Sequence, residues 1–197
     1  MAENIGYLQS DSSKNGDEQY TPSYAVRPLL EFIPSNKIIW CPFDKEWSAF
    51  VDVLENNGNK VIYSHIDYGQ NFFDYEPQKW DILVSNPKWD ILVSNPPFSK
   101  KDAVLRRAYE LNKPFALLLP ANSIQGKTRF EIFKNDVQML CFDQRIDFMN
   151  PKHMDSPVKG TPFGSAYFCR GLLPTRLELR RLDKKAYNIA SALQSPQ

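Results

Sequence analysis

The sequence predicts an α/β fold of three layers, in which helices cover both faces of a mostly parallel central sheet. Two observations predict this class. Short, continuous apolar runs are typical of strands that are buried on both faces. Between these runs lie amphipathic stretches of about ten residues, the pattern expected of strand-helix-strand units. The chain has 197 residues, of which 42% are hydrophobic, so it can form one domain with a sizeable core.

The elements are expected in the following order. A flexible tail over residues 1–16 is polar and has no apolar periodicity. A first helix is expected to begin at Thr21-Pro22-Ser23, because proline is favoured in the first helical turn. Strands are predicted at residues 38–41, 60–66, 90–93, 115–119, 139–142 and 165–169, and further helices at 47–54, 101–111, 128–133 and 173–192. The chain thus divides into the tail, a main domain over 17–172 and a basic C-terminal helix or tail over 173–197.

Charge and cysteine content exclude several functional classes. Lys and Arg number 24 against 23 Asp and Glu, so a nucleic-acid surface would have to be a local patch. Three separated cysteines without a CxxC pair disfavour a disulfide framework and a zinc ribbon. His153 has no Glu or Cys at metal-ligand spacing, so no metal site is expected. Without a signal core or a membrane-length apolar run, the protein is expected in the cytoplasm and away from membranes.

One segment of the sequence is duplicated. Residues 79–87 and 88–96 both read KWDILVSNP, and both copies have the same propensity to form a strand. Only the second copy continues into Pro97-Phe98, so we expect the second copy to occupy the sheet. The first copy would then need cover for its apolar side chains, and a homodimer through this segment is one way to provide it.

The most informative motif is Asn95-Pro96-Pro97-Phe98, directly after an apolar strand. Two prolines fix the backbone and remove two N–H groups, so the Asn95 side chain and the Pro96 carbonyl can accept hydrogen bonds. Phe98 offers a flat face, and together these groups suit an amino group on a planar ring. A proline-rich turn with an asparagine helix cap is the alternative interpretation. Since ligands bind beyond the carboxyl ends of parallel strands, residues 41–44, 65–68 and 94–98 are expected to share one crevice.

This motif resembles the (D/N/S)PP(Y/F/W) motif of class I S-adenosylmethionine-dependent amino-methyltransferases, especially DNA N6-adenine methyltransferases from bacteria and phages. The resemblance covers roughly residues 17–170. It implies a Rossmann-like class I methyltransferase fold, S-adenosylmethionine as cofactor, DNA adenine as substrate, and a bacterial or phage-infected cell. It assigns catalysis to Asn95, Pro96, Pro97 and Phe98. The cofactor residues that it implies are Tyr20, Thr21, Pro22, Cys41, Pro42, Phe43, Asp44, Ser48, Asp67, Asn71 and Phe72.

Nucleic-acid contacts are expected from Lys127 and Arg129, in the loop after the strand at 115–119. A solvated loop explains these two charges equally well. The basic run over 176–185 could likewise follow a nucleic-acid backbone or form a solvated helix face.

Other functions remain open at this point. RNA adenine or a protein glutamine amide would suit the same Asn-Pro-Pro-aromatic geometry. The loop after the first strand lacks the glycines usual in this family, which favours a catalytically inactive nucleic-acid-binding relative instead. The absence of a Gly-rich phosphate loop disfavours a nucleotidyltransferase.

Overall fold

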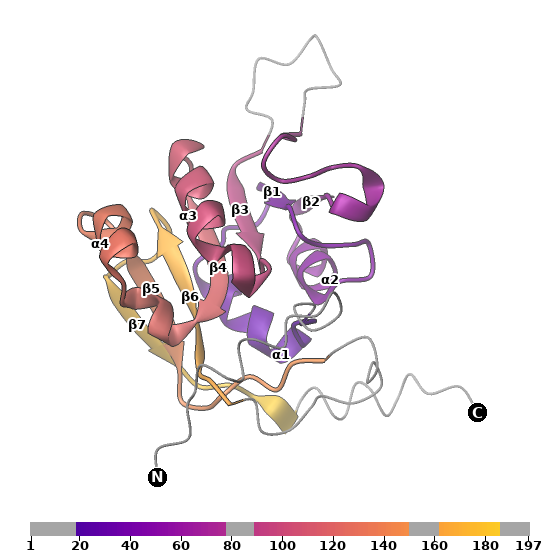
Figure 1. Cartoon of the computed structure of the whole chain (residues 1–197). Helices are drawn as coiled ribbons and strands as arrows, with labels where there is room; N and C mark the ends of the chain where they lie inside the picture. Colours follow the sequence, from indigo (N-terminus) through magenta and orange to yellow (C-terminus); the bar gives the residue numbers. More distant parts are fainter. Residues whose placement is uncertain (1–18, 78–88, 150–161, 186–197) are drawn as a thin grey trace.

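The computed structural model describes residues 19–77, 89–149 and 162–185. This part forms one seven-stranded sheet with helices packed against it (Figure 1). The expected tail over 1–16 and the first copy of the repeat, residues 79–87, lie outside the described residues. The strands are β1 (Ile38–Cys41), β2 (Lys60–Tyr63), β3 (Ile91–Ser94), β4 (Phe115–Pro120), β5 (Gln138–Phe142), β6 (Ser165–Arg170) and β7 (Leu177–Arg180). The helices are α1 (Ser23–Val26), α2 (Ala49–Asn56), α3 (Lys101–Glu110) and α4 (Lys127–Phe133), with short 3-10 helices η2 (Arg27–Glu31), η3 (Ile66–Tyr68), η4 (Phe98–Lys100) and η5 (Ala121–Ile124).

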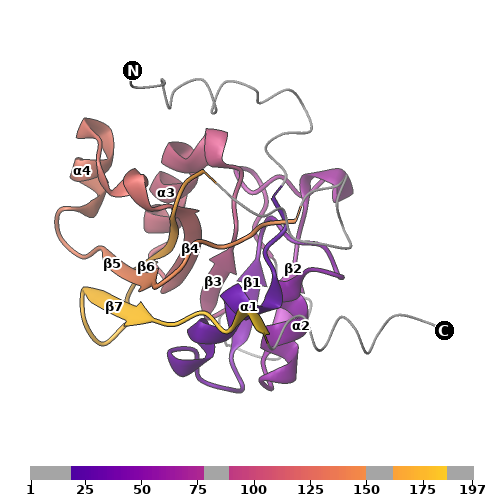
Figure 2. The same cartoon turned by 90° about the horizontal axis from the view of Figure 1, so that it is seen from below.

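Apolar clusters fill both sides of the sheet. One cluster joins α1 and α2 to strand residues such as Ile39 and Val93, and the other joins α3 and α4 to Trp40 and Leu92. Successive strand residues point to opposite faces, which is why the neighbours Ile39 and Trp40 enter different clusters. Figure 2 shows the sheet between the two helix pairs. The sheet is therefore the middle of three layers, as predicted.

The strand order is β2-β1-β3-β4-β6-β5-β7. The first four of these strands are mutually parallel, whereas β6 is antiparallel to both of its neighbours and β7 is parallel to β5. This mixed, mostly parallel sheet is compatible with a Rossmann-like fold. The chain passes from β1 to β2 on one side and returns to β3 on the other, so the order reverses between β1 and β3. Ligands of open α/β sheets bind outside the carboxyl ends at such a point.

The second copy of the repeat forms β3, which confirms that prediction. Ile91 lies opposite Ile39 of β1, and Val93 lies opposite Ala116 of β4. The copy is also anchored at its start, where the buried Trp89 packs against Trp40 with ring centroids 5.2 Å apart.

The other predicted elements are confirmed with small shifts, except at two places. The first helix changes from α to 3-10 geometry at Arg27, next to Pro28, which has no N–H for a helical hydrogen bond. The predicted helix over 173–192 is wrong where the structure describes it, because residues 177–180 form strand β7. Leu177–Arg180 pairs with the open edge of β5, and this backbone pairing outweighs the helical tendency of a charged segment.

Candidate functional site

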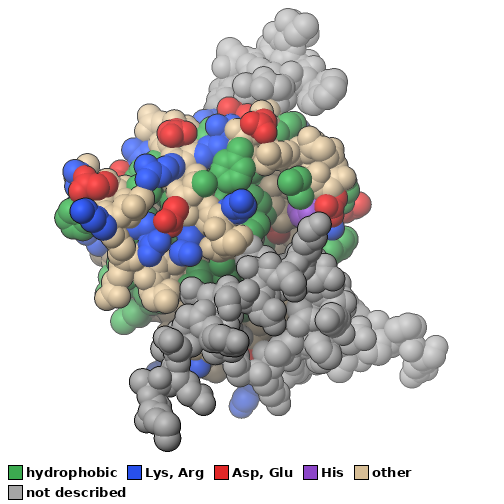
Figure 3. All heavy atoms as spheres, in the orientation of Figure 1, with side chains coloured by type: hydrophobic (Ala, Val, Ile, Leu, Met, Phe, Trp, Pro, Cys, Tyr) green, Lys and Arg blue, Asp and Glu red, His purple; other side chains and the backbone are tan. Residues whose placement is uncertain are grey.

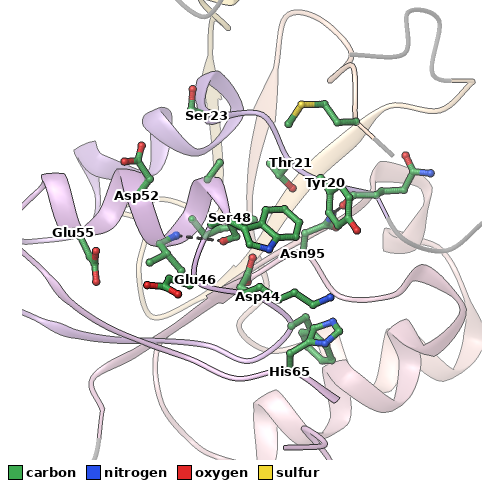
Figure 4. Close-up of a pocket in the computed structure, with 18 residues that line it drawn as sticks. Tyr20, Thr21, Ser23, Asp44, Glu46, Ser48, Asp52, Glu55, His65 and Asn95 are labelled. Carbon is green, nitrogen blue, oxygen red and sulfur yellow. Dashed lines mark hydrogen bonds between the residues drawn. The ribbon is translucent and has the colours of Figure 1, made fainter. Parts of the chain in front are cut away.

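A pocket of about 550 Å³ opens at the carboxyl ends of β1 and β3 (Figure 4). Its walls come from the segment before α1, the β1–α2 loop, the first turns of α2 and the residue after β3. The volume lies within the usual range of small-molecule sites. Asp44, His65 and Asn95, from the three strand ends expected to share a crevice, all line this pocket, which confirms that expectation.

Helix α2 begins at the wall of the pocket. The Ser48 hydroxyl caps this helix by accepting a hydrogen bond of 3.4 Å from the Val51 amide. Asp52 and Glu55 follow Ser48 by four and seven residues, so they lie on the same face of the helix, and all three line the pocket. Helix α2 therefore places one hydroxyl at its capped end and two carboxylates further along the same face, in the pocket wall.

Asp44 is the buried acid of the pocket, with 7% of its surface exposed. Its carboxylate accepts a short hydrogen bond from the hydroxyl of Ser94, the last residue of β3. Burial raises the pKa of Asp44 to about 6, although hydrogen bonds from Ser94 and Ser48 lower it. No ion pair to Asp44 occurs within the described ranges, so a cationic ligand group would stabilise its charged form.

Asn95 presents a free acceptor next to this acid. Its Nδ2 group donates a hydrogen bond of 2.7 Å to the carbonyl oxygen of Gln19. A carbonyl can only accept, so this bond fixes which end of the amide is nitrogen. The Oδ1 atom is buried and has no hydrogen-bond partner in the described part of the chain. An unpaired buried acceptor costs about 1–3 kcal/mol, and a ligand amino group would satisfy it.

The segment before α1 closes one side of the pocket. Tyr20 and Met149 exchange two backbone hydrogen bonds of 2.7 and 2.9 Å, which hold this segment in place. Thr21 lines the pocket, and its hydroxyl is likewise buried without a partner among the described residues. The Tyr20 ring packs edge-to-face on Trp47, with ring centroids 4.8 Å apart. Two unpaired polar atoms and an aromatic pair thus surround the same space.

The structure brings six of the expected site residues together. They come from three separate segments of the chain and all line the pocket: Tyr20, Thr21, Phe43, Asp44, Ser48 and Asn95. Pro22 and Pro42 are buried beside them, in the segments that enter α1 and leave β1.

Two of the expected cofactor residues belong to the core instead. Cys41 is fully buried on the α1–α2 side of the sheet, and burial raises the pKa of its thiol. Phe72 is 2% exposed and packs against Trp40 and Phe43. The expectation that these two side chains contact the cofactor is therefore corrected, because each points into an apolar cluster rather than into the crevice.

Pro96, Pro97 and Phe98 lie beyond the pocket wall that Asn95 forms. Phe98 begins the 3-10 helix η4 and packs edge-on against Phe148 and Phe163, at centroid distances of 6.2 and 5.6 Å. The motif therefore supplies one residue to the pocket and an aromatic group next to it.

Asp67 and Asn71 have local partners outside the pocket. Asp67 is exposed and forms a 2.7 Å ion pair with Lys45; the hydrogen bond from Lys45 and the charge of His65 lower its pKa. Asn71 bonds Asp74 and the Phe73 amide, as is typical of a turn residue. Neither residue lines the pocket.

Arg129 is a structural residue and not a free phosphate ligand. It pairs with Asp102 at 2.8 Å and donates to the carbonyls of Ser123 and Gln125. Its guanidinium packs over Gly126, where an added Cβ would lie 2.7 Å from it. Lys127 is exposed. Figure 3 shows Lys and Arg side chains interspersed with Asp and Glu over α3 and α4.

Sequence reasoning missed several lining residues, among them Gln19, Glu46, Trp47, Asp52, Glu55 and Met149. The helical spacing of Ser48, Asp52 and Glu55 would have identified two of them. Gln19 and Met149 contribute through backbone pairing of distant segments, which no local pattern reveals.

No protein-family model matches this sequence, and no curated protein is significantly similar to it. Among residues 19–77, 89–149 and 162–185, no group of three or more His, Cys, Asp or Glu is arranged to hold a metal ion. The helices in these ranges are all too short or too polar to cross a membrane.

Proposed function

We propose that this protein is an S-adenosylmethionine-dependent methyltransferase that acts on the N6 amino group of adenine in DNA. The observation that carries the proposal is the buried Oδ1 atom of Asn95, which has no partner among the described residues and belongs to a residue that lines a ligand-sized pocket. The position of Asn95 after β3, followed by Pro-Pro-Phe, supports the resemblance to amino-methyltransferases. The sheet supports it too, because its order reverses beside the pocket.

The residues of the pocket fit the cofactor. S-adenosylmethionine is polar and carries a net positive charge, and the pocket combines acidic residues with two unpaired buried polar atoms. Asp44, Ser48 and Thr21 would hold its polar and charged groups, and Phe43 would pack against its flat ring. When bound, the cofactor supplies a methyl group on a sulfonium, which becomes a neutral thioether as the amino nitrogen takes the methyl group and releases a proton.

The protein's contribution is positioning. Asn95 Oδ1 accepts one amino hydrogen of the target base, and the Pro96 carbonyl is a second acceptor after the same strand. Both acceptors direct the nitrogen lone pair away from the ring. Holding the reacting groups in contact can contribute about 7–11 kcal/mol to lowering a barrier.

The aromatic group next to Asn95 supports a planar substrate. Phe98, the last residue of the motif, forms a cluster with Phe148 and Phe163. A base taken out of a nucleic-acid stack is held by such stacking surfaces and by hydrogen bonds to its edge.

A competition assay tests this proposal. The protein is incubated with isotope-labelled S-adenosylmethionine and an adenine-containing DNA, an RNA of the same sequence and a glutamine-containing peptide. We expect label in DNA, lost at least a hundredfold in Asn95→Ala and retained in Asn135→Ala, a control at an exposed asparagine. Label in RNA alone or in peptide alone would identify that class as the substrate instead of DNA. No label in any of the three would contradict the proposed methyltransferase activity.

A further inference from the structure

The pocket has an acidic lining. Asp44, Glu46, Asp52 and Glu55 all contribute to its wall. The ammonium group of Lys45, which also lines it, forms an ion pair with Asp67 outside the pocket. Thr21 lines the same space, and its buried hydroxyl has no partner among the described residues, which independently indicates a polar ligand.

Among the acids of the pocket, Asp44 is the one linked through Ser94 to Asn95, the residue proposed to bind the substrate amino group. Its carboxylate bonds the hydroxyl of Ser94, and Ser94 directly precedes Asn95. The hydroxyl partners of Asp44 are neutral, so its charge is not cancelled by a cation from the described residues. A buried carboxylate attracts a nearby cation more strongly than an exposed one, because the local dielectric constant is low.

The aromatic pair adds a second element of cation recognition. Tyr20 and Trp47 line the pocket and pack edge-to-face, and Trp47 is 52% exposed. The faces of such rings attract cations, including fully alkylated ones that cannot donate hydrogen bonds. A carboxylate combined with aromatic rings is the chemistry that recognises a sulfonium.

From this arrangement we infer that the pocket selects the positively charged methyl donor over its neutral product, S-adenosylhomocysteine. Asp44 and the Tyr20–Trp47 pair are the discriminating groups. The inference rests on the proposed function, since it concerns the same cofactor in the same pocket. Its consequence is weak product inhibition: once the methyl group is transferred, the ligand loses the charge that these groups hold.

Calorimetric titration with three ligands tests the inference. The ligands are S-adenosylmethionine, S-adenosylhomocysteine, and sinefungin, which carries a protonated amine in place of the methyl-bearing sulfonium. We expect both charged ligands to bind about tenfold more tightly than the neutral one. In Asp44→Asn the ratio is expected to fall to about threefold or less, and Glu110→Gln, an exposed acid on α3, is expected to leave it unchanged.

A second variant covers the case in which Asp44→Asn does not fold. Trp47→Leu changes a half-exposed side chain, and it is expected to weaken the charged ligands more than the neutral one. Equal affinity of the wild-type protein for all three ligands, or tighter binding of the product, would overturn the selectivity but leave the cofactor assignment standing. Failure of all three ligands to bind would overturn the proposed function itself.

Discussion

The amide of Asn95 donates a hydrogen bond of 2.7 Å to the main-chain carbonyl of Gln19. This bond joins the end of β3 to a segment 76 residues earlier in the chain, and it leaves the side-chain oxygen as an acceptor without a partner in the part of the chain that the structure describes. A single side chain thus closes one wall of the pocket and orients the atom that we propose to bind the substrate.

Asn95→Asp tests this relationship. The carboxylate keeps an acceptor for the substrate but places a second acceptor against the Gln19 carbonyl, so that one buried contact becomes repulsive. We expect the free energy of unfolding to fall by about 1–3 kcal/mol, measured by urea denaturation at pH 8. We also expect partial recovery of stability at acidic pH, where the protonated carboxyl can donate again. An unchanged stability at both pH values would contradict the role of the Gln19 contact.

Asp44 is expected to reduce stability at neutral pH. Its pKa is about 6 in the folded protein against an ordinary value of 3.8, so the folded state binds its proton more tightly than the unfolded state. The stabilisation from this proton is complete below about pH 4 and is lost as the pH rises through 6. Asp44→Asn should therefore raise the free energy of unfolding at pH 8 by about 3 kcal/mol, and by much less at pH 4. A variant less stable than wild type at pH 8 would contradict this assignment.

Cofactor binding should depend on pH through the same group. A cationic ligand favours ionised Asp44, so affinity is highest well above pH 6 and falls as the pH is lowered through that value. The other titratable groups near Asp44 include Cys41 and Tyr167, whose raised pKa values keep them neutral. The pocket wall adds Lys45, Glu46, Asp52, Glu55 and His65. Titrations from pH 5 to 8 with wild type and Asp44→Asn measure this. A slope that persists unchanged in the variant would contradict the role of Asp44 in this pH dependence.

A buried hydrogen bond between Trp40 and Ser64 is expected to contribute to the stability of the fold. The Trp40 indole N–H donates to the Ser64 hydroxyl at 2.9 Å, and both side chains are fully buried. Ser64→Ala leaves the indole N–H unpaired, at an expected cost of about 1–3 kcal/mol. Ser123→Ala is the matched control, because the buried Ser123 hydroxyl has no partner within the described ranges. Equal losses in the two variants by thermal unfolding would argue against the Trp40–Ser64 bond.

Deleting one copy of the repeat should preserve the fold. Removing residues 79–87 or 88–96 gives the same sequence, which retains one complete strand. Glu76 and Trp89 are joined by a hydrogen bond of 3.3 Å, so the intervening segment begins and ends at nearby points. We expect an unfolding temperature within a few degrees of wild type, and sedimentation before and after the deletion tests the proposed homodimer. A chain that no longer unfolds cooperatively would show that both copies are required.

The parts of this structure that depend on local pattern could be predicted from the sequence. The apolar runs at β1, β3 and β4 are buried on both faces, and their carboxyl ends converge because parallel strands end at one edge. The choice between the two copies of the repeat was also predictable, since only the second leads into Pro97-Phe98.

The remaining parts depend on contacts between distant segments. Strand β7 forms because the edge of β5 is open, and its own sequence does not reveal this. The charge of Arg129 alone suggested a phosphate contact. Its actual partners, Asp102 on α3 and neighbouring carbonyls, cannot be read from the local sequence. Cys41 and Phe72 fit a family pattern by position. The alternation of side chains along β1 places Cys41 in the core, and packing against Trp40 places Phe72 there.

The most direct measurement is mass-spectrometric detection of N6-methyladenine in DNA incubated with the protein and deuterium-labelled S-adenosylmethionine. We predict labelled N6-methyladenine with the wild-type protein and its loss in Asn95→Ala, with the variant still folded. Labelled product at the same rate in Asn95→Ala, or label at any atom other than N6, would contradict the account.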